Sequence, residues 1–231
     1  MKASQEEKNK PKLLELFAGS RDISKIADGL GFETFSIDIE PFDGIDLVAD
    51  ILDVEASDVP FTPDMVWASF DCTTYSIAAV STHREDRIIP KSDYARKCDA
   101  VNIHSISLIN QWVELNPEMV FFIENPRGML RHMPFMQEFK RETVWYCQYG
   151  DERAKPTDIW TNSKTWEPRP QCKNYKYDAD GNIINRHCHH HAARRGAKTG
   201  TQGRKGSYNR SLVPKALHAE ILISAMNNKG A

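Results

Sequence analysis

Two strongly apolar stretches that each end in polar residues constrain the fold of this chain most. Asp64–Ala68 is followed by Ser69-Phe70-Asp71-Cys72, and Met119–Ile123 is followed by Glu124-Asn125-Pro126-Arg127. Apolar runs of this length that stop at polar residues are typical of strands buried in a parallel sheet. In an open α/β sheet the ligand crevice lies beyond the carboxyl ends of the strands. The pattern therefore predicts that a cysteine and a carboxylic acid meet at one edge of the sheet.

The rest of the chain continues this alternation of strands and helices. The 231 residues are enough for one core and a small appendage. A long helix capped by Ser92 should bury a face that includes Tyr94, Cys98 and Trp112. Further strands are expected at Leu13–Ala18, Glu33–Ile37 and Ile45–Ala49, helices at Asp22–Leu30 and Val213–Met226, and an antiparallel pair at Thr143–Gln148 and Thr157–Thr161. This order predicts an α/β fold that ends in a hairpin.

The formal net charge of −2 hides a strong asymmetry along the chain. Residues 1–150 hold 15 Lys and Arg against 25 Asp and Glu, whereas residues 151–231 hold 15 against 7. A basic last third on an acidic body suggests that this third faces a polyanion. A solvated face that balances the acidic half would have the same composition, so charge alone leaves both readings open.

Targeting and cysteine signals predict a cytoplasmic protein. Residues 1–12 are polar and lack the apolar segment of a signal peptide, and the chain has no run of about 18 apolar residues. The five cysteines are an odd number without a regular disulfide pattern, which favours free thiols in a reducing compartment. We therefore expect no membrane association.

Three strand ends carry features that suit an adenosine-bearing cofactor. Leu16-Phe17-Ala18-Gly19-Ser20 joins a strand to a helix through glycine, and helix N–H groups at such a turn can face a ligand. The loop has one glycine and is not the G-x-G-x-x-G fingerprint, so an ordinary tight turn explains it equally well. Asp38 at the next strand end could accept hydrogen bonds from ribose. Asp50-Ile51 at the third offers a polar and an apolar contact for adenine.

Together these motifs resemble those of the DNA (cytosine-5) methyltransferases, especially the compact phage and bacterial members. Cys72 matches the nucleophile of their Pro-Cys motif, and Glu124-Asn125 matches their Glu-Asn motif. Arg153 and Lys155 lie in a stretch that resembles the family's arginine motif, and Asn209–Ile221 is loosely similar to its final motif. The resemblance implies a cofactor site for S-adenosyl-L-methionine made of Phe17, Ala18, Gly19, Ser20, Asp38, Ile39, Asp50, Ile51 and Ser211, with Glu40 as a second acid after the second strand.

The resemblance also implies a fold and a division of the chain. The fold would be a class I S-adenosylmethionine-dependent methyltransferase-like (Rossmann-like) α/β sheet with a small basic target-recognition insert. Residues 13–162 would form the catalytic and cofactor-binding domain, residues 163–208 the insert, and residues 209–228 a C-terminal helix that docks back. The partner would be double-stranded DNA with a cytosine flipped out of the helix, since a duplex hides C5 and C6. Protein partners stay open.

The family chemistry gives each matched residue a role. Cytosine C5 is a poor nucleophile, so a Cys72 thiolate adds at C6 and Glu124 assists at N3, after which C5 accepts the methyl group. Arg153 and Lys155 would contact the base oxygen or a nearby phosphate. Taken alone, Cys72 reads as a small buried hydrophobe and Glu124 as a strand-end acid paired with Arg127. Their joint occurrence with the Phe17–Gly19 loop favours the functional reading.

Three positions depart from the family pattern. Asp71 stands where the family has Pro, Thr157 where it usually has Arg, and Arg210 where it has Asn. A carboxylate beside Cys72 disfavours the thiolate unless a cation, the substrate or the cofactor sulfonium offsets it. Asp71 also has the chemistry to bind a cytosine amine or a modified base.

The basic insert carries two competing interpretations. Its cations suit phosphate contacts in a loop that orders on DNA, and these are Arg194, Arg195, Lys198, Arg204 and Lys205. A disordered basic loop is the simpler alternative. Cys172, Cys188 and His189 offer zinc-type ligands without a paired C-x-x-C, so a metal site is the weaker expectation.

The sequence thus predicts a DNA cytosine-5 methyltransferase of the small DNA-modification or restriction-modification type, in a bacterial cell or a phage-infected host. Two alternatives stay open. One is a related C5-pyrimidine transferase with an altered donor or a modified base, determined by Asp71. The other is an inactive homologue that binds DNA without chemistry. An RNA substrate is equally compatible with a basic loop.

Overall fold

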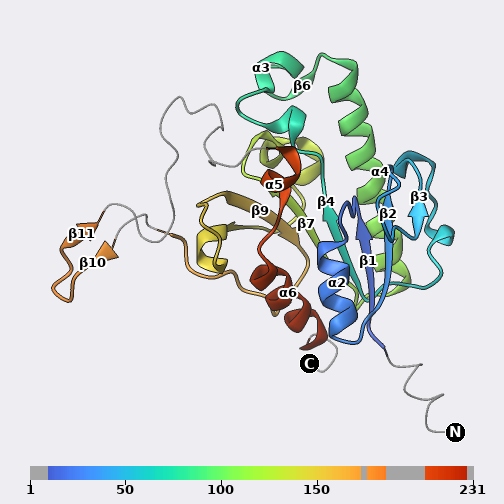
Figure 1. Ribbon diagram of the computed structural model, residues 1–231. Coiled ribbons are helices and arrows are strands. Elements are labelled where there is room, and N and C mark those ends of the chain that lie inside the picture. Colours follow the sequence, from blue (N-terminus) through green and yellow to red (C-terminus); the bar gives the residue numbers. More distant parts are fainter. Residues whose placement is uncertain (1–9, 173–175, 186–205, 228–231) are drawn as a thin grey trace, which may run out of the picture.

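A mixed sheet of seven strands forms the centre of the protein (Figure 1). The structure is a computed structural model that describes residues 10–172, 176–185 and 206–227. The strand order is β3-β2-β1-β4-β7-β9-β8; the first five strands are parallel, and β9 is antiparallel to both of its neighbours, β7 and β8. The strands are β1 Lys12–Leu16, β2 Glu33–Asp38, β3 Leu47–Val48, β4 Met65–Ser69, β7 Val120–Pro126, β8 Arg141–Trp145 and β9 Pro156–Thr161.

Helices cover both faces of this sheet. α2 (Asp22–Gly29) and α6 (Lys215–Asn227) pack against each other on one face, and α4 (Asp93–Leu115) covers the other (Figure 1). Side chains alternate between the faces, so Leu13 and Trp67 join the α2–α6 core, whereas Leu14 and Ala68 join the α4 core. The central strands therefore bury apolar side chains on both faces, as the sequence pattern predicted, although β1 also carries the buried Glu15.

The order of these strands is that of a class I S-adenosylmethionine-dependent methyltransferase-like sheet. The chain runs outward from β1 through β2 to β3, then returns across β1 to β4 and β7. The reversal between β1 and β4 makes a topological switch point, where open α/β sheets bind ligands beyond the strand ends. The fold class predicted from the sequence is confirmed.

Several local predictions are confirmed and two are wrong in detail. The Ser92 hydroxyl accepts a hydrogen bond from Ala95 N at 3.1 Å and caps α4 as expected. The strand expected at Thr143–Gln148 ends at Trp145, because Tyr146 N donates to Ala154 O instead of continuing the strand. Tyr146–Tyr149 then forms a short 3₁₀ helix, η7, which ends at Gly150 with a φ of 84°. The third strand is confined to Leu47–Val48.

Smaller elements occur before α4 and again in the last third of the chain. α3 (Val80–His83) precedes a two-stranded ribbon of β5 (Arg84–Glu85) and β6 (Ile89–Pro90). A second ribbon joins β10 (Lys176–Tyr177) to β11 (Ile183–Asn185), and α5 (Ser207–Ser211) precedes α6. In the described part of the chain, no helix combines the length and apolarity needed to cross a membrane.

Candidate active site

Cys72 and Glu124 come together because β4 and β7 are neighbours in the sheet. Ser69 and Glu124 are register partners, and Phe70 N donates to Glu124 O at 3.2 Å. The Asn125 side-chain amide donates to Phe70 O at 2.8 Å and joins the two strand ends a second time. The thiol three residues after Ser69 is thus held beside the carboxyl group, as the sequence predicted.

The Cys72 thiol lies in a setting that keeps it protonated. Its backbone (φ −89°, ψ −6°) occupies the bridge region common among active-site residues and starts the 3₁₀ helix η4 (Thr73–Tyr75). Burial, followed by the negative charges of Glu124 and Asp71, raises the pKa of Cys72 to about 11. Lys155 acts in the opposite direction. In the ligand-free protein, the thiol form therefore dominates at neutral pH.

Tyr146 orients the carboxyl group of Glu124. Its hydroxyl donates a 2.9 Å hydrogen bond to Glu124 Oε1, and both side chains are buried. Burial raises the pKa of Glu124, while Lys155 and the Tyr146 hydroxyl lower it. Burial also lowers the pKa of Lys155, with Glu124 opposing that change. At neutral pH the protonated form of this carboxyl group is therefore favoured more than in an ordinary glutamate. Sequence reasoning missed Tyr146, since a tyrosine after a strand resembles ordinary core.

The guanidinium of Arg153, for which the resemblance implied a base or phosphate contact, makes its contacts within the protein. It is buried, pairs with Asp151 at 2.5 Å, and donates to Arg210 O at 3.0 Å and Leu212 O at 2.9 Å. Lys155 Nζ donates to Arg210 O at 2.9 Å and lies 4.7 Å from the centre of the Tyr146 ring. Both cations therefore anchor the carboxyl end of α5, and the charge of Lys155 also acts on Cys72 and Glu124.

Asp71 makes specific contacts beside Cys72. Its Oδ1 accepts from Thr73 N at 2.8 Å, and its Oδ2 accepts a short hydrogen bond from the Tyr94 hydroxyl. The Cys98 thiol lies 3.8 Å from Asp71 Oδ2. The hydrogen bond from Tyr94 to Asp71 also explains why Tyr94, which was expected on the buried face of α4, is 45% exposed.

The loop after β1 has the strained backbone of a ligand-binding turn. Phe17 has φ 58°, a genuine outlier for a bulky residue, and its ring packs edge-on against Phe70 at 5.6 Å. Gly19 N donates to Asp38 Oδ2 at 2.8 Å, so the end of β2 fixes this loop. The ordinary tight turn that the sequence allowed would not need a positive φ at phenylalanine.

A cavity of 240 Å³ joins three strand ends to the nucleophile loop. It includes five predicted cofactor residues, and Asp50 at its rim pairs with Lys97 at 2.7 Å. Its apolar lining includes Val101 and Ile37. The lining residues that the sequence singled out are Phe17, Asp38, Ile39, Asp50, Ile51 and Asp71. An apolar slot with carboxylates at strand ends fits the adenosine part of S-adenosylmethionine.

The other predicted cofactor residues do not line this cavity. Ala18 is buried, and Gly19 and Ser20 continue the same loop toward α2. Ser211 is exposed at the end of α5, where its hydroxyl donates to Tyr208 O at 2.8 Å and its carbonyl accepts from Lys155 at 3.3 Å. Ser211 thus contacts the active site through its backbone.

A buried polar network supports the segment that follows Cys72. Arg84 donates to both carboxylate oxygens of Asp99 at 2.7 and 3.0 Å, and to Thr74 O at 3.1 Å. The Tyr75 hydroxyl donates to Asp99 at 2.6 Å and accepts from Asn102 at 2.9 Å. Because Asp99 and Asn102 belong to α4, this network fixes the nucleophile segment to the long helix. Bidentate Arg–carboxylate pairs are among the strongest of such contacts.

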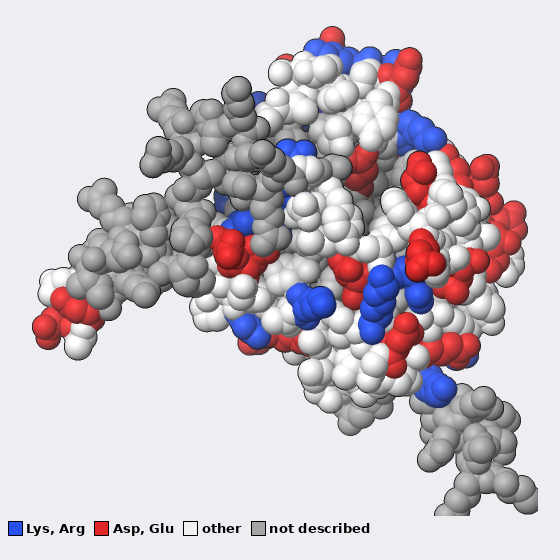
Figure 2. Space-filling model, in the orientation of Figure 1, with Lys and Arg blue, Asp and Glu red and all other residues white. Residues whose placement is uncertain are grey.

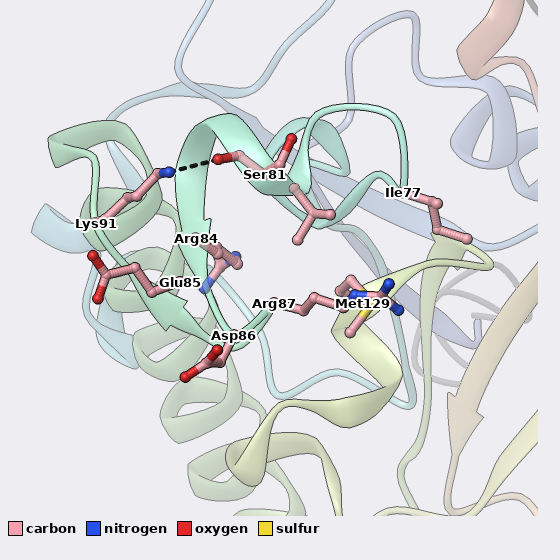
Figure 3. A pocket seen from close by; sticks show the side chains of 9 residues that line it. Ile77, Ser81, Arg84, Glu85, Asp86, Arg87, Lys91 and Met129 are labelled. Atoms are coloured by element: carbon pink, nitrogen blue, oxygen red, sulfur yellow. Dashed lines mark hydrogen bonds between the residues drawn. The ribbon is translucent and has the colours of Figure 1, made fainter.

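A second cavity of 530 Å³ opens between this segment and the turn after β7 (Figure 3). Arg87 and Met129 both line it, and Lys91 Nζ donates to Ser81 O at 2.5 Å. Ile77 at its rim is 72% exposed. The sequence analysis did not single out this groove, which lies close to Cys72 along the chain.

The surface of the described residues leaves the predicted polyanion contact untested. Acidic side chains gather around the β3 edge of the sheet (Figure 2). The predicted DNA-binding residues Arg194, Arg195, Lys198, Arg204 and Lys205 lie outside the described residues, as do Cys188 and His189. Cys172 is buried, and among the described residues no group of three metal-ligating side chains comes together.

Comparisons with known proteins add little to this site. No family model and no curated protein matches the chain. Among solved structures it is similar to the methyltransferase EhMeth of Entamoeba histolytica, with 13% identity and a TM-score of 0.47 over 71% of this chain and 57% of that one. It is also similar to a DNMT2 mutant of Spodoptera frugiperda, with 15% identity and a TM-score of 0.44 over 71% and 54%. The chain spans little more than half the length of either structure.

Proposed function

We propose that this chain is an S-adenosylmethionine-dependent methyltransferase that modifies C5 of cytosine in DNA. The observation that carries the proposal is the meeting of Cys72 and Glu124 beside the 240 Å³ cavity at the strand ends. A thiol and a carboxylic acid of raised pKa, next to a cavity that fits the adenosine part of the cofactor, suit C5 chemistry on a pyrimidine. The predicted roles of Phe17, Asp38, Asp50 and Ile51 in cofactor binding belong to this proposal.

The residues of the site divide the reaction between them. Cys72 Sγ adds to C6 of the base, and Glu124 holds N3 and donates a proton there as negative charge develops on the ring. When bound, S-adenosylmethionine supplies the methyl group that C5 accepts. Water in the site then takes the C5 proton, the electrons of that C–H bond form the C5–C6 double bond as the C6–S bond breaks and releases the Cys72 thiolate, and N3 returns its proton to Glu124. Lys155 offsets the negative charge around Cys72.

The substrate in this proposal is double-stranded DNA whose target cytosine is flipped into the site. Residues 163–208 would form the target-recognition insert, with the five basic residues named above on phosphates. The groove beside Arg87 lies on the same side as the nucleophile segment and offers a second place for the nucleic acid (Figure 3). In this proposal the protein works in the cytoplasm of a bacterial or phage-infected cell.

The proposal is tested by nucleoside mass spectrometry on DNA incubated with the protein and S-adenosylmethionine. Duplex DNA should gain one methyl group per modified cytosine, and Cys72→Ala should abolish the product. A parallel incubation with RNA separates the two nucleic acids. Methylation that persists in Cys72→Ala, or that appears on RNA alone, would contradict the assignment.

One observation favours a second candidate. The high pKa of Cys72, and the Asp71 carboxylate beside it, also suit a homologue that binds DNA without chemistry or that acts on a modified base. An Asp71→Pro variant that methylates cytosine when the native chain does not would support this alternative.

A further inference from the structure

Asp71 lines the same cavity as the strand-end residues Phe17, Asp38 and Asp50. Its position is set by two contacts, the 2.8 Å hydrogen bond from Thr73 N and the hydrogen bond from the Tyr94 hydroxyl. Tyr94 comes from α4, so the carboxylate is held from two separate elements. A carboxylate fixed in this way at a cavity wall can act on whatever occupies the cavity.

The cavity has an excess of negative charge. Its charged lining residues are Asp38, Asp50, Asp71 and Lys97, and Lys97 already pairs with Asp50. The Asp38 oxygens accept from Gly19 N at 2.8 Å and Glu40 N at 2.9 Å. Asp71 makes no ion pair with a lysine or arginine in the described part of the chain. The cavity therefore favours a ligand that carries a positive charge.

The position of Asp71 along the chain indicates which part of the ligand it faces. The methyl-bearing sulfur must point toward the base that Cys72 holds, and Asp71 directly precedes Cys72. Asp38 and Asp50 lie at the ends of β2 and β3, on the side expected for the ribose and adenine. Asp71 is thus the acid closest in the chain to the reacting end of the donor.

We propose that Asp71, held by Tyr94, is the counter-ion of the donor's sulfonium and makes the cavity prefer the charged donor over its neutral product. The proposal rests on the proposed function. Transfer of the methyl group removes the positive charge, so the attraction to Asp71 is lost in S-adenosylhomocysteine. The carboxylate therefore strengthens donor binding and weakens retention of the product.

Isothermal titration of the full chain with S-adenosylmethionine and S-adenosylhomocysteine tests this. The native protein should bind the donor about tenfold more tightly than the product, and Asp71→Asn should bring the two dissociation constants together. Asp93→Asn is the matched control, because its exposed side chain makes the same charge change one residue from Tyr94. It should keep the native ratio.

Tyr94→Phe gives a second, independent measurement. It leaves the carboxylate in place but removes one of its two anchors, so the ratio should fall part of the way. A ratio that Asp71→Asn leaves unchanged overturns the proposal, as does equal binding of both ligands by the native chain. Failure of the proposed function is distinct, since the native chain would then bind neither ligand.

Discussion

The buried hydroxyl of Tyr146 lies 2.9 Å from Glu124 Oε1, and the ammonium of Lys155 lies over the Tyr146 ring. This contact joins η7, which follows β8, to the acid at the end of β7. The residue proposed to protonate the base is therefore positioned by a side chain from another part of the sheet.

Tyr146→Phe should lower kcat about fivefold with little change in the affinity for S-adenosylmethionine. The loss of one buried hydrogen bond leaves the carboxyl group free to rotate, an effect of about 1 kcal/mol. Because this bond lowers the pKa of Glu124, the variant should also keep its activity to higher pH. Tyr149→Phe is the control, since that hydroxyl accepts from Arg169 N outside the site. Equal losses in both variants would contradict the role of Tyr146.

Asp71→Asn should make Cys72 more reactive toward iodoacetamide in the ligand-free protein. The Asp71 charge is one of the causes that raise the pKa of Cys72 to about 11, so its removal lowers that pKa and increases the thiolate fraction at a given pH. The rate is read by mass spectrometry of the peptide that contains Cys72. Asp93→Asn should keep the native rate, and an unchanged rate in Asp71→Asn would refute the electrostatic argument.

Glu15→Gln should stabilise the protein at neutral and alkaline pH. Burial raises the pKa of Glu15 to about 7 from 4.5, and Ser24 N and Oγ donate to its Oε2 at 3.1 and 2.5 Å. The native stability should therefore fall as pH rises from 4.5 to 7, by about 3 kcal/mol, and then level off. Urea unfolding across this range measures it. Glu33→Gln, at an exposed position, should keep the native slope, and a Glu15→Gln variant that also keeps it would exclude this account.

Gly128→Ala should destabilise the protein and disturb the nucleophile segment. A Cβ at Gly128 would lie 2.5 Å from Tyr75 O, which is backbone and cannot move aside easily. We expect a loss of about 2 kcal/mol and faster hydrogen exchange over residues 72–80. At Gly29 in α2, an added Cβ meets no atom within 4 Å, so Gly29→Ala should be neutral or slightly stabilising. Equal effects of the two substitutions would show that close backbone approach is not the cause.

The fold could be predicted because strand and helix periodicity persists through Thr161, and each buried strand ends in a polar motif. Those ends fix where Cys72 and Glu124 meet, since parallel neighbours share an edge. Tyr146 could not be predicted, because its role depends on where η7 places its hydroxyl. The expected burial of Tyr94 was wrong, and the internal contacts of Arg153 could not be predicted, for a similar reason: each long side chain reaches a partner that only the tertiary structure reveals.

The central claim is that Cys72 attacks C6 of a flipped cytosine. Trapping on duplex DNA that contains 5-fluorocytosine tests it most directly, because fluorine at C5 blocks release of the enzyme after methyl transfer. With S-adenosylmethionine present, the account predicts a stable covalent adduct that peptide mapping places on Cys72 and that Cys72→Ala does not form. A native chain that binds this DNA and the cofactor but forms no adduct, or an adduct on another cysteine, would contradict it.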